Sequence, residues 1–190
     1  MIKAVIFDCF GVVIADVLER ALAEIRTRDP QMAEEMADVI SAANHGIIEV
    51  PEARGRIAAM MGLTAEEYHE QIVKGNQKDE RLLAYILQLR NTYKTAMLSN
   101  VGKGSLEKRF VNGELERCFD VVVSSGDIGY AKPEPQAYEI VAERLGVRLD
   151  ECFFTDDREE YVEAARRLGM QAVQYRSFDE FITEASKILD

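Results

Sequence analysis

Two kinds of hydrophobic pattern divide the chain into an alternating part and a purely helical part. Residues 4–7 form an apolar run without alternation, and residues 93–98, 120–123, 152–155 and 172–175 also have the pattern of short strands. Such runs are typical of strands that helices cover on both faces of a parallel sheet. Helical patterns separate the later runs, including one from about Ser105. The chain therefore predicts an α/β fold with a doubly wound parallel sheet of about five strands.

Residues 16–90 show no convincing strand pattern and instead repeat apolar positions at helical spacing. Pro30 and Pro51 can each begin a helix, because proline is tolerated in the first helical turn. We therefore expect a helical insertion at residues 16–90, after the first strand. Residues 1–15 and 91–190 would together form the sheet domain.

The composition limits the partners and the location. The chain has 23 Lys and Arg against 34 Asp and Glu, a formal net charge of -11, which would repel nucleic acids and anionic membranes. A small phosphorylated substrate stays compatible with this charge where a metal ion supplies positive charge. No apolar run approaches the roughly 18 residues of a membrane-spanning helix. Three widely spaced cysteines without a zinc or redox motif fit a reducing cytoplasm, which is the expected location.

Polar side chains follow four successive strands of the predicted sheet. Asp8 follows the first run, Ser99 and Asn100 the second, Lys132 lies in the loop after the third, and Asp156 with Asp157 follows the fourth. Because ligands bind at the carboxyl edge of open α/β sheets, we expect these side chains to meet there. Each also has a structural interpretation, as a helix cap or a solvated lysine, but their combination favours a catalytic site.

The order of these residues resembles the four motifs of the haloacid dehalogenase-like (HAD) hydrolase superfamily, and the resemblance covers the whole chain. The matching segments are residues 7–12 (FDCFGV), 98–100 (LSN), 129–135 (GYAKPEP) and 154–157 (FTDD). The resemblance implies a Rossmann-like catalytic core, with residues 16–90 as an α-helical cap.

The resemblance further implies that Asp8 is a nucleophile that attacks phosphorus and forms a covalent acyl phosphate. Such an intermediate divides one difficult step into two easier ones. Ser99 and Lys132 would hold the phosphoryl oxygens, and Asn100 and Gly11 would contribute to substrate binding. Gly11 also lets the backbone turn sharply where a ligand approaches.

A Mg²⁺ ion is the cofactor that the resemblance implies. Its ligands would be the carboxylates of Asp8 and Asp157 and the backbone carbonyl of Phe10, while Asp156 would join the metal shell or position Lys132. Hard oxygen ligands and substrate phosphate suit Mg²⁺, whose charge would offset the repulsion between a carboxylate and a phosphate.

Phe10 departs from the family pattern. Phosphatases of the family usually carry a second aspartate at this position, which serves as general acid for the leaving group and general base for water. Such assistance is typically worth ~10²–10⁴-fold in rate, so we expect weakened phosphatase chemistry on a small metabolite. Tyr161 is a second departure, for which packing is the favoured interpretation.

Two other functions are compatible with the sequence. The family's 2-haloacid dehalogenases have a tyrosine at the position of Phe10 and need no metal, but they usually lack an acidic pair like Asp156 and Asp157. A non-catalytic binding or regulatory protein is the other alternative, against which the intact Asp8 and Lys132 argue. The substrate and the oligomeric state do not follow from the sequence.

Overall fold

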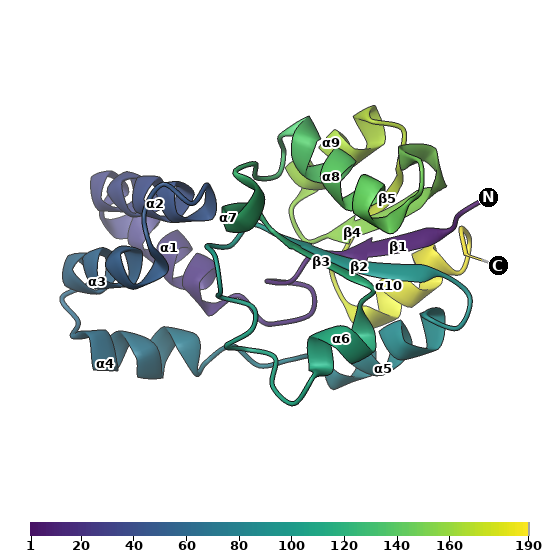
Figure 1. The fold of residues 1–190 in the computed structure, drawn as a ribbon. Helices are drawn as coiled ribbons and strands as arrows, with labels where there is room; N and C mark the ends of the chain where they lie inside the picture. The colour runs from purple at the N-terminus through teal and green to yellow at the C-terminus, as the bar shows by residue number, and fades with distance from the viewer. Residues whose placement is uncertain (190) are drawn as a thin grey trace.

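The computed structural model describes residues 1–189, with every side chain in this range except that of Val73. One parallel sheet has the strand order β3, β2, β1, β4, β5, which confirms the predicted α/β fold (Figure 1). The strands are β1 (Ala4–Phe7), β2 (Lys94–Ser99), β3 (Val121–Ser124), β4 (Cys152–Asp156) and β5 (Gln171–Gln174). All side chains of the central β1 are buried, which explains why the first apolar run does not alternate.

Helices cover both faces of the sheet (Figure 1). On one face lie α8 (Pro135–Leu145) and α9 (Glu159–Arg167), where the buried Tyr138 and Val162 pack against Phe154 of β4. Tyr138 and Phe154 meet edge to face with ring centroids 5.5 Å apart. A short 3₁₀ turn, Leu149–Glu151, leads into β4.

The opposite face carries α5 (Glu80–Leu89), α6 (Glu114–Cys118) and α10 (Phe178–Ala185). Phe181 of α10 stacks on Phe153 of β4 with ring centroids 6.2 Å apart. Among the described helices, none combines the length and the apolar character that crossing a bilayer requires.

A second group of helices lies beside the sheet and has its own apolar cluster, which includes Leu22, Met36 and Ile57 (Figure 1). We call this group the inserted helices. They are α1 (Val17–Arg28), α2 (Pro30–Asn44), α3 (Val50–Met60), α4 (Ala65–Tyr68) and a π-helical turn, His69–Val73. Asp16 begins the group by accepting the N–H of Glu19 at 2.9 Å, as an N-cap residue does.

Helix α5 packs differently from the rest of residues 16–90. Its buried Leu82 and Ile86 belong to the apolar cluster of the sheet, together with Phe7, and not to the cluster of the inserted helices. The predicted division at residue 90 stays a prediction, and we propose that the inserted helices end before α5.

Residues 101–113 form successive turns where the sequence predicts a helix from about Ser105. Only eight residues separate Gly104 from Gly113, and Asn112 and Gly113 both have a positive φ, of 55° and 72°, which a helix does not allow. A β-carbon at Gly102 would overlap Val50 of α3, so the chain passes close to the inserted helices at this point. Helix α6 begins only after the segment ends.

The end of α2 lies against α7 (Ser125–Ile128) and connects the inserted helices to the sheet domain. Gly46 has a φ of +69°, and a β-carbon there would lie 2.8 Å from the carbonyl oxygen of Gly126. Beside it, Nε2 of His45 lies 3.1 Å from Oε2 of Glu134. These contacts fix the inserted helices next to the carboxyl edge of the sheet.

Candidate active site

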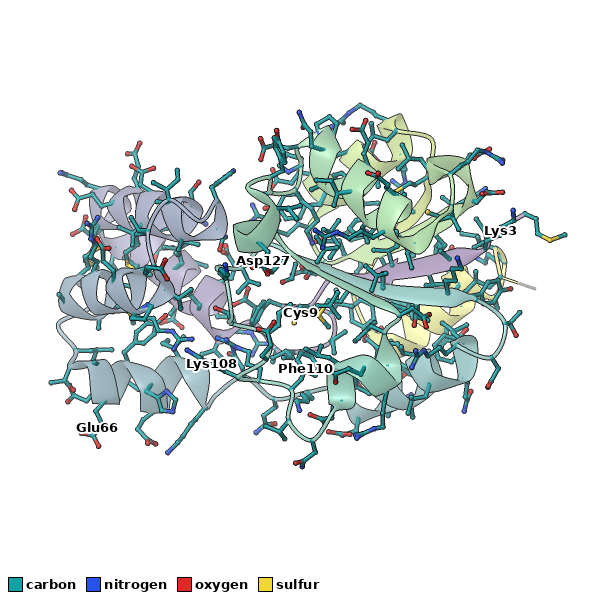
Figure 2. The ribbon with its side chains drawn as sticks, viewed as in Figure 1. Lys3, Cys9, Glu66, Lys108, Phe110 and Asp127 are labelled. Carbon is teal, nitrogen blue, oxygen red and sulfur yellow. The ribbon has the colours of Figure 1, made fainter. Side chains whose placement is uncertain are left out.

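Three charged side chains meet at the carboxyl edge of the sheet. Asp8 follows β1, and its backbone N–H donates to the carbonyl of Thr155 in β4 at 2.9 Å. Nζ of Lys132 lies 2.5 Å from Oδ1 of Asp8 and also donates to Oδ2 of Asp156. All three side chains are buried. Figure 2 shows Cys9, the neighbour of Asp8, between the strands and the inserted helices.

Asn100 holds the backbone of Lys132. Its Oδ1 accepts the N–H of Lys132 at 2.8 Å, and its Nδ2 donates to the carbonyl of Lys132 at 2.7 Å. Nδ2 also lies 3.3 Å from the hydroxyl of Tyr161, which is 8% exposed. Because the amide is already bonded within the protein, these contacts support a positioning role for Asn100, and its part in substrate binding stays a prediction.

Asp8, Asp156 and Asp157 form a compact acidic group, with one carboxylate oxygen of each within 4.8 Å of the others. Burial raises the pKa of Asp8 to about 8 and that of Asp157 to about 6, although Lys132 acts in the opposite direction on both. Burial also opposes the charge of Lys132, but Asp156 and Asp8 outweigh it and raise the pKa of the amine.

This acidic group fits a divalent cation. Its donors are hard carboxylate oxygens, which suit Mg²⁺ better than the nitrogen and sulfur ligands that zinc takes. Bringing carboxylates together in a buried place is unfavourable unless a positive charge lies among them. A bound cation would add to the charge of Lys132 and favour the ionised form of each carboxylate.

The absence of a side chain at Gly11 leaves room for the carboxylate of Asp157 in the acidic group. The φ of Gly11 is +91°, and a β-carbon at this position would overlap the carboxylate of Asp157. A larger residue at position 11 would therefore both strain the backbone and displace the carboxylate of Asp157. This close approach explains the glycine physically, while its predicted part in substrate binding stays a prediction.

Ser99 lies at the end of β2 and is 1% exposed. Its Oγ has no hydrogen-bond partner among the described residues. A buried hydroxyl without a partner is costly, and a ligand oxygen can remove that cost. Ser99 lines the same cavity as Asp8, so the unpaired hydroxyl supports the predicted contact with a phosphoryl oxygen.

A cavity of about 180 Å³ lies between the sheet edge and the inserted helices. Asp8, Phe10 and Ser99 line it from the sheet domain, while Ile40 of α2 and Tyr68 of α4 line it from the inserted helices. The sequence patterns predicted the first set of residues but not the second. The second set depends on how the inserted helices dock, which the helical spacing does not encode.

Arg109 also lines this cavity and was not predicted from the sequence. Its guanidinium carbon lies 4.9 Å from the centre of the Phe10 ring. Arg109 belongs to none of the four motifs and comes directly after Lys108 in a polar segment. Without the structure, nothing distinguishes its side chain from that of an exposed basic residue.

A larger hollow, of about 1030 Å³, lies at the opposite edge of the sheet, where the strands begin. Two of its basic residues are already ion-paired, Lys3 with Glu151 and Arg90 with Asp120. The hollow contains none of the residues of the acidic group. The candidate catalytic residues therefore line the smaller cavity and not this hollow.

A family model for haloacid dehalogenase-like hydrolases matches residues 2–169. The chain belongs to this hydrolase family. That membership agrees with the acidic group, the buried lysine and the order of the strands, and it confirms the resemblance noted from the motifs.

The chain is similar in sequence to several named proteins. The chain is 26% identical over 208 residues to the D-ribitol-5-phosphate phosphatase of Bacteroides thetaiotaomicron, and the match covers all of both chains. It is 28% identical over 196 residues to an (S)-2-haloacid dehalogenase of Xanthobacter autotrophicus, covering 92% of this chain and 75% of that one. Phosphatase MT3486 of Mycobacterium tuberculosis is 55% identical over 58 residues, but the match covers only 30% of this chain and 27% of that phosphatase.

Solved structures of HAD-like proteins share the fold over nearly the whole chain. The HAD family enzyme bt-2542 of Bacteroides thetaiotaomicron, in complex with magnesium and inorganic phosphate, aligns with a TM-score of 0.75 at 25% identity, covering 94% of this chain and 96% of that one. A predicted HAD-like family hydrolase of Porphyromonas gingivalis aligns with a TM-score of 0.78 at 24% identity, covering 100% and 98%.

In this HAD-like hydrolase, Lys132→Met should lower the free energy of unfolding by about 3–5 kcal/mol, because it leaves the buried Asp8 and Asp156 without a counter-charge. The loss should be larger at pH 8 than at pH 5. Without the lysine, the folded-state pKa of Asp8 rises further above its unfolded value. The free energy of unfolding therefore falls as the pH rises from the unfolded pKa toward the folded pKa. Urea unfolding at both pH values measures the effect.

Lys187→Met is the control for that experiment, since Lys187 forms an exposed ion pair with Glu184 at 2.6 Å. Its loss should cost less than about 1 kcal/mol at either pH. Equal costs for the two substitutions would show that the buried lysine does not stabilise the carboxylates as described.

Proposed function

We propose that the protein is a Mg²⁺-dependent phosphatase that acts on a small phosphorylated metabolite through an aspartyl-phosphate on Asp8. The observation that carries the proposal is the meeting of Asp8, Asp156 and Asp157 beside the buried amine of Lys132. Similarity to a D-ribitol-5-phosphate phosphatase, and to an enzyme solved with magnesium and inorganic phosphate, supports it.

The carboxylates of Asp8 and Asp157 and the backbone carbonyl of Phe10 would hold the Mg²⁺ ion. Oδ1 of Asp156 accepts the N–H of Arg158 at 3.0 Å, and its Oδ2 accepts from Lys132. Asp156 is therefore already bonded on both oxygens, which favours fixing the lysine over binding the metal. When bound, the ion would supply the positive charge that brings a carboxylate and a phosphate together.

In the first step, an oxygen of Asp8 bonds to phosphorus as the bond from phosphorus to the ester oxygen breaks. Lys132 and Ser99 would hold the phosphoryl oxygens. The departing oxygen must gain a proton, which the ring of Phe10 cannot donate, so the proton comes from water. In the second step, water attacks phosphorus, the bond to Asp8 breaks, and inorganic phosphate leaves. Esters with poor leaving groups should therefore react slowly.

We also propose that the inserted helices act as a cap over this reaction. Ile40 and Tyr68 line the cavity opposite Asp8, so the inserted helices would exclude bulk water and contact the part of the substrate beyond the phosphate. Action in the cytoplasm stays a prediction. The net charge of -11 continues to argue against a nucleic-acid partner.

The experiment that tests the phosphatase function measures phosphate release by the wild-type protein from a panel of small phosphate esters. Each ester is assayed with Mg²⁺ and with EDTA. We expect slow release that depends on Mg²⁺ and stops with EDTA. Absence of release from every ester, or undiminished release in EDTA, would overturn the proposal. Mg²⁺ should also raise the unfolding temperature of the wild type and do so less in Asp157→Asn.

Dehalogenation is the second candidate, favoured by the aromatic Phe10 and by the similarity to an (S)-2-haloacid dehalogenase. In this reaction Asp8 would attack carbon, and a halide ion would leave without needing a proton. Chloride release from (S)-2-chloropropionate in the presence of EDTA measures it. The acidic group argues against the reaction, because chemistry without a metal does not need Asp157 beside Asp8.

A further inference from the structure

Arg109 is a largely buried cation in the cavity, and the proposed reaction does not use it. Of its N–H groups, Nη1 donates to the carbonyl of Ser105 at 2.9 Å. Nε is buried and has no hydrogen-bond partner among the described residues. Because a buried donor without an acceptor is costly, the side chain is suited to an acceptor that a ligand brings.

No carboxylate of the described residues forms an ion pair with Arg109. Asp16 attracts it, but the carboxylate of Asp16 accepts the N–H of Glu19 at the start of α1. This guanidinium therefore has no carboxylate partner among the described residues, although the chain is acidic, with a net charge of -11. Buried arginines are ordinarily paired.

A second arginine acts electrostatically on Arg109. Burial lowers the pKa of Arg109, and the like charge of Arg54 in α3 lowers it further. Both arginines also act on the phenol of Tyr68, which lines the cavity. Arg54 likewise has no ion pair among the described residues. A bound anion would relieve the repulsion that Arg109 experiences from this like charge.

Phe10 leaves Arg109 free to bind such an anion. The ring lies against the guanidinium, with its centre 4.9 Å from Cζ. Contact with an aromatic ring uses the face of a guanidinium, whereas a carboxylate or phosphate binds its N–H edge. The residue that replaces the usual aspartate thus supports the arginine and adds no competing negative charge.

We propose that Arg109 binds a second anionic group of the substrate, a carboxylate or another phosphate, and so selects phosphate esters that carry one. This inference rests on the proposed phosphatase function. It narrows the substrate class from any small phosphate ester to esters with an anion at the end distant from the reacting phosphate. Arg109 would be a specificity residue and would take no part in bond breaking.

Matched pairs of esters test the proposal. In each pair the carbon chain is the same, and one member carries a carboxylate where the other carries an alcohol. The pairs are 3-phosphoglycerate with glycerol 3-phosphate, and 4-phosphoerythronate with erythritol 4-phosphate. The wild type should prefer the carboxylate member of at least one pair by about tenfold or more in kcat/KM, as expected for a charged hydrogen-bond partner. Propane-1,3-diol bisphosphate distinguishes a second phosphate from a carboxylate.

Arg109→Met keeps the length of the side chain and removes its charge. We expect the preference within each pair to fall by about tenfold, mainly through a higher KM for the anionic member. Arg109→Lys should restore part of the preference. Lys108→Met is the matched control, because it removes one positive charge from the neighbouring exposed side chain and should leave the preference unchanged. An equal loss on both members of a pair would overturn the inference.

Calorimetric binding of the same pairs separates this inference from the phosphatase proposal. If no ester is hydrolysed but the wild type binds 3-phosphoglycerate more tightly than glycerol 3-phosphate, and Arg109→Met removes the difference, the anion site stands and the proposed function fails. If esters are hydrolysed with no preference for the carboxylate member of either pair or for propane-1,3-diol bisphosphate, the phosphatase proposal is supported and the anion site is ruled out. Equal binding of both members together with no hydrolysis overturns both.

Discussion

Asp8→Asn is expected to reduce phosphate release by at least about 10³-fold in kcat, because an amide oxygen cannot replace a carboxylate as the nucleophile. The two side chains have the same shape, so the substitution should leave the sheet edge intact. Phosphate release from the best ester of the panel measures the loss. Mass spectrometry of the intact protein, quenched during turnover, should detect a phosphorylated wild type and no phosphorylated variant.

The stability of Asp8→Asn shows whether its inactivity reflects chemistry or misfolding. Burial raises the pKa of Asp8 to about 8 in the folded protein, above the unfolded value near 3.9. Wild-type stability should therefore fall as the pH rises from about 4 toward 8, because the folded state binds more protons than the unfolded state. The substituted amide does not titrate, so the variant should be at least as stable as the wild type at pH 8.

Asp38→Asn provides a matched control for that substitution, since Asp38 is exposed on α2. It should leave turnover unchanged. Residual activity in Asp8→Asn above a tenth of the wild-type value, in a folded protein, would rule out Asp8 as the nucleophile.

The sequence alone could predict that the polar residues of the motifs lie close together, because the carboxyl ends of parallel strands lie at the same edge of the sheet. Once β1 and β4 pair in register, Phe7 lies opposite Thr155, and the next residues of both strands reach the same edge. Asp8 and Asp156 are then neighbours whatever the loops do. Apolar runs ending on acidic residues are therefore a strong sequence signal.

Helix α5 shows where the helical pattern loses resolution. Leu87 and Leu89 are both apolar and lie within one turn of this helix, yet Leu87 is 44% exposed and Leu89 is buried. One turn of a helix can contain several apolar residues. The width of the sheet surface against which the helix packs determines which of these residues are buried. The pattern also cannot tell which apolar cluster a helix joins.

Contacts across the cavity could not be predicted, because they depend on docking. Arg109 reaches the cavity through a segment of turns, and Tyr68 reaches it through a short helix of the inserted group. Neither position has a periodic or motif signal. The double hydrogen bond from Asn100 to the backbone of Lys132 likewise requires a loop geometry that residue types alone do not specify.

Phe10→Asp should raise phosphatase turnover on glycerol 3-phosphate by about 10²-fold, the lower end of the range for general acid-base assistance. The new carboxyl would lie beside Arg109, whose guanidinium now contacts the Phe10 ring. That cation would hold the carboxyl ionised, which helps a general base activate water but hinders a general acid. Glycerol 3-phosphate has no second anion, so binding of substrate by Arg109 does not complicate the result.

Comparing esters with different leaving groups shows why turnover rises in Phe10→Asp. p-Nitrophenolate leaves without protonation, so turnover of p-nitrophenyl phosphate should rise much less than turnover of the alkyl ester. Phe10→Asn places a similar polar group in the cavity without a transferable proton and should show no gain on either ester. An equal gain on both esters in Phe10→Asp alone would mean that the carboxylate assists the attack of water, a step that both esters share. A gain in Phe10→Asn as well would mean that the ring of Phe10 limits access and that proton transfer is not what the site lacks.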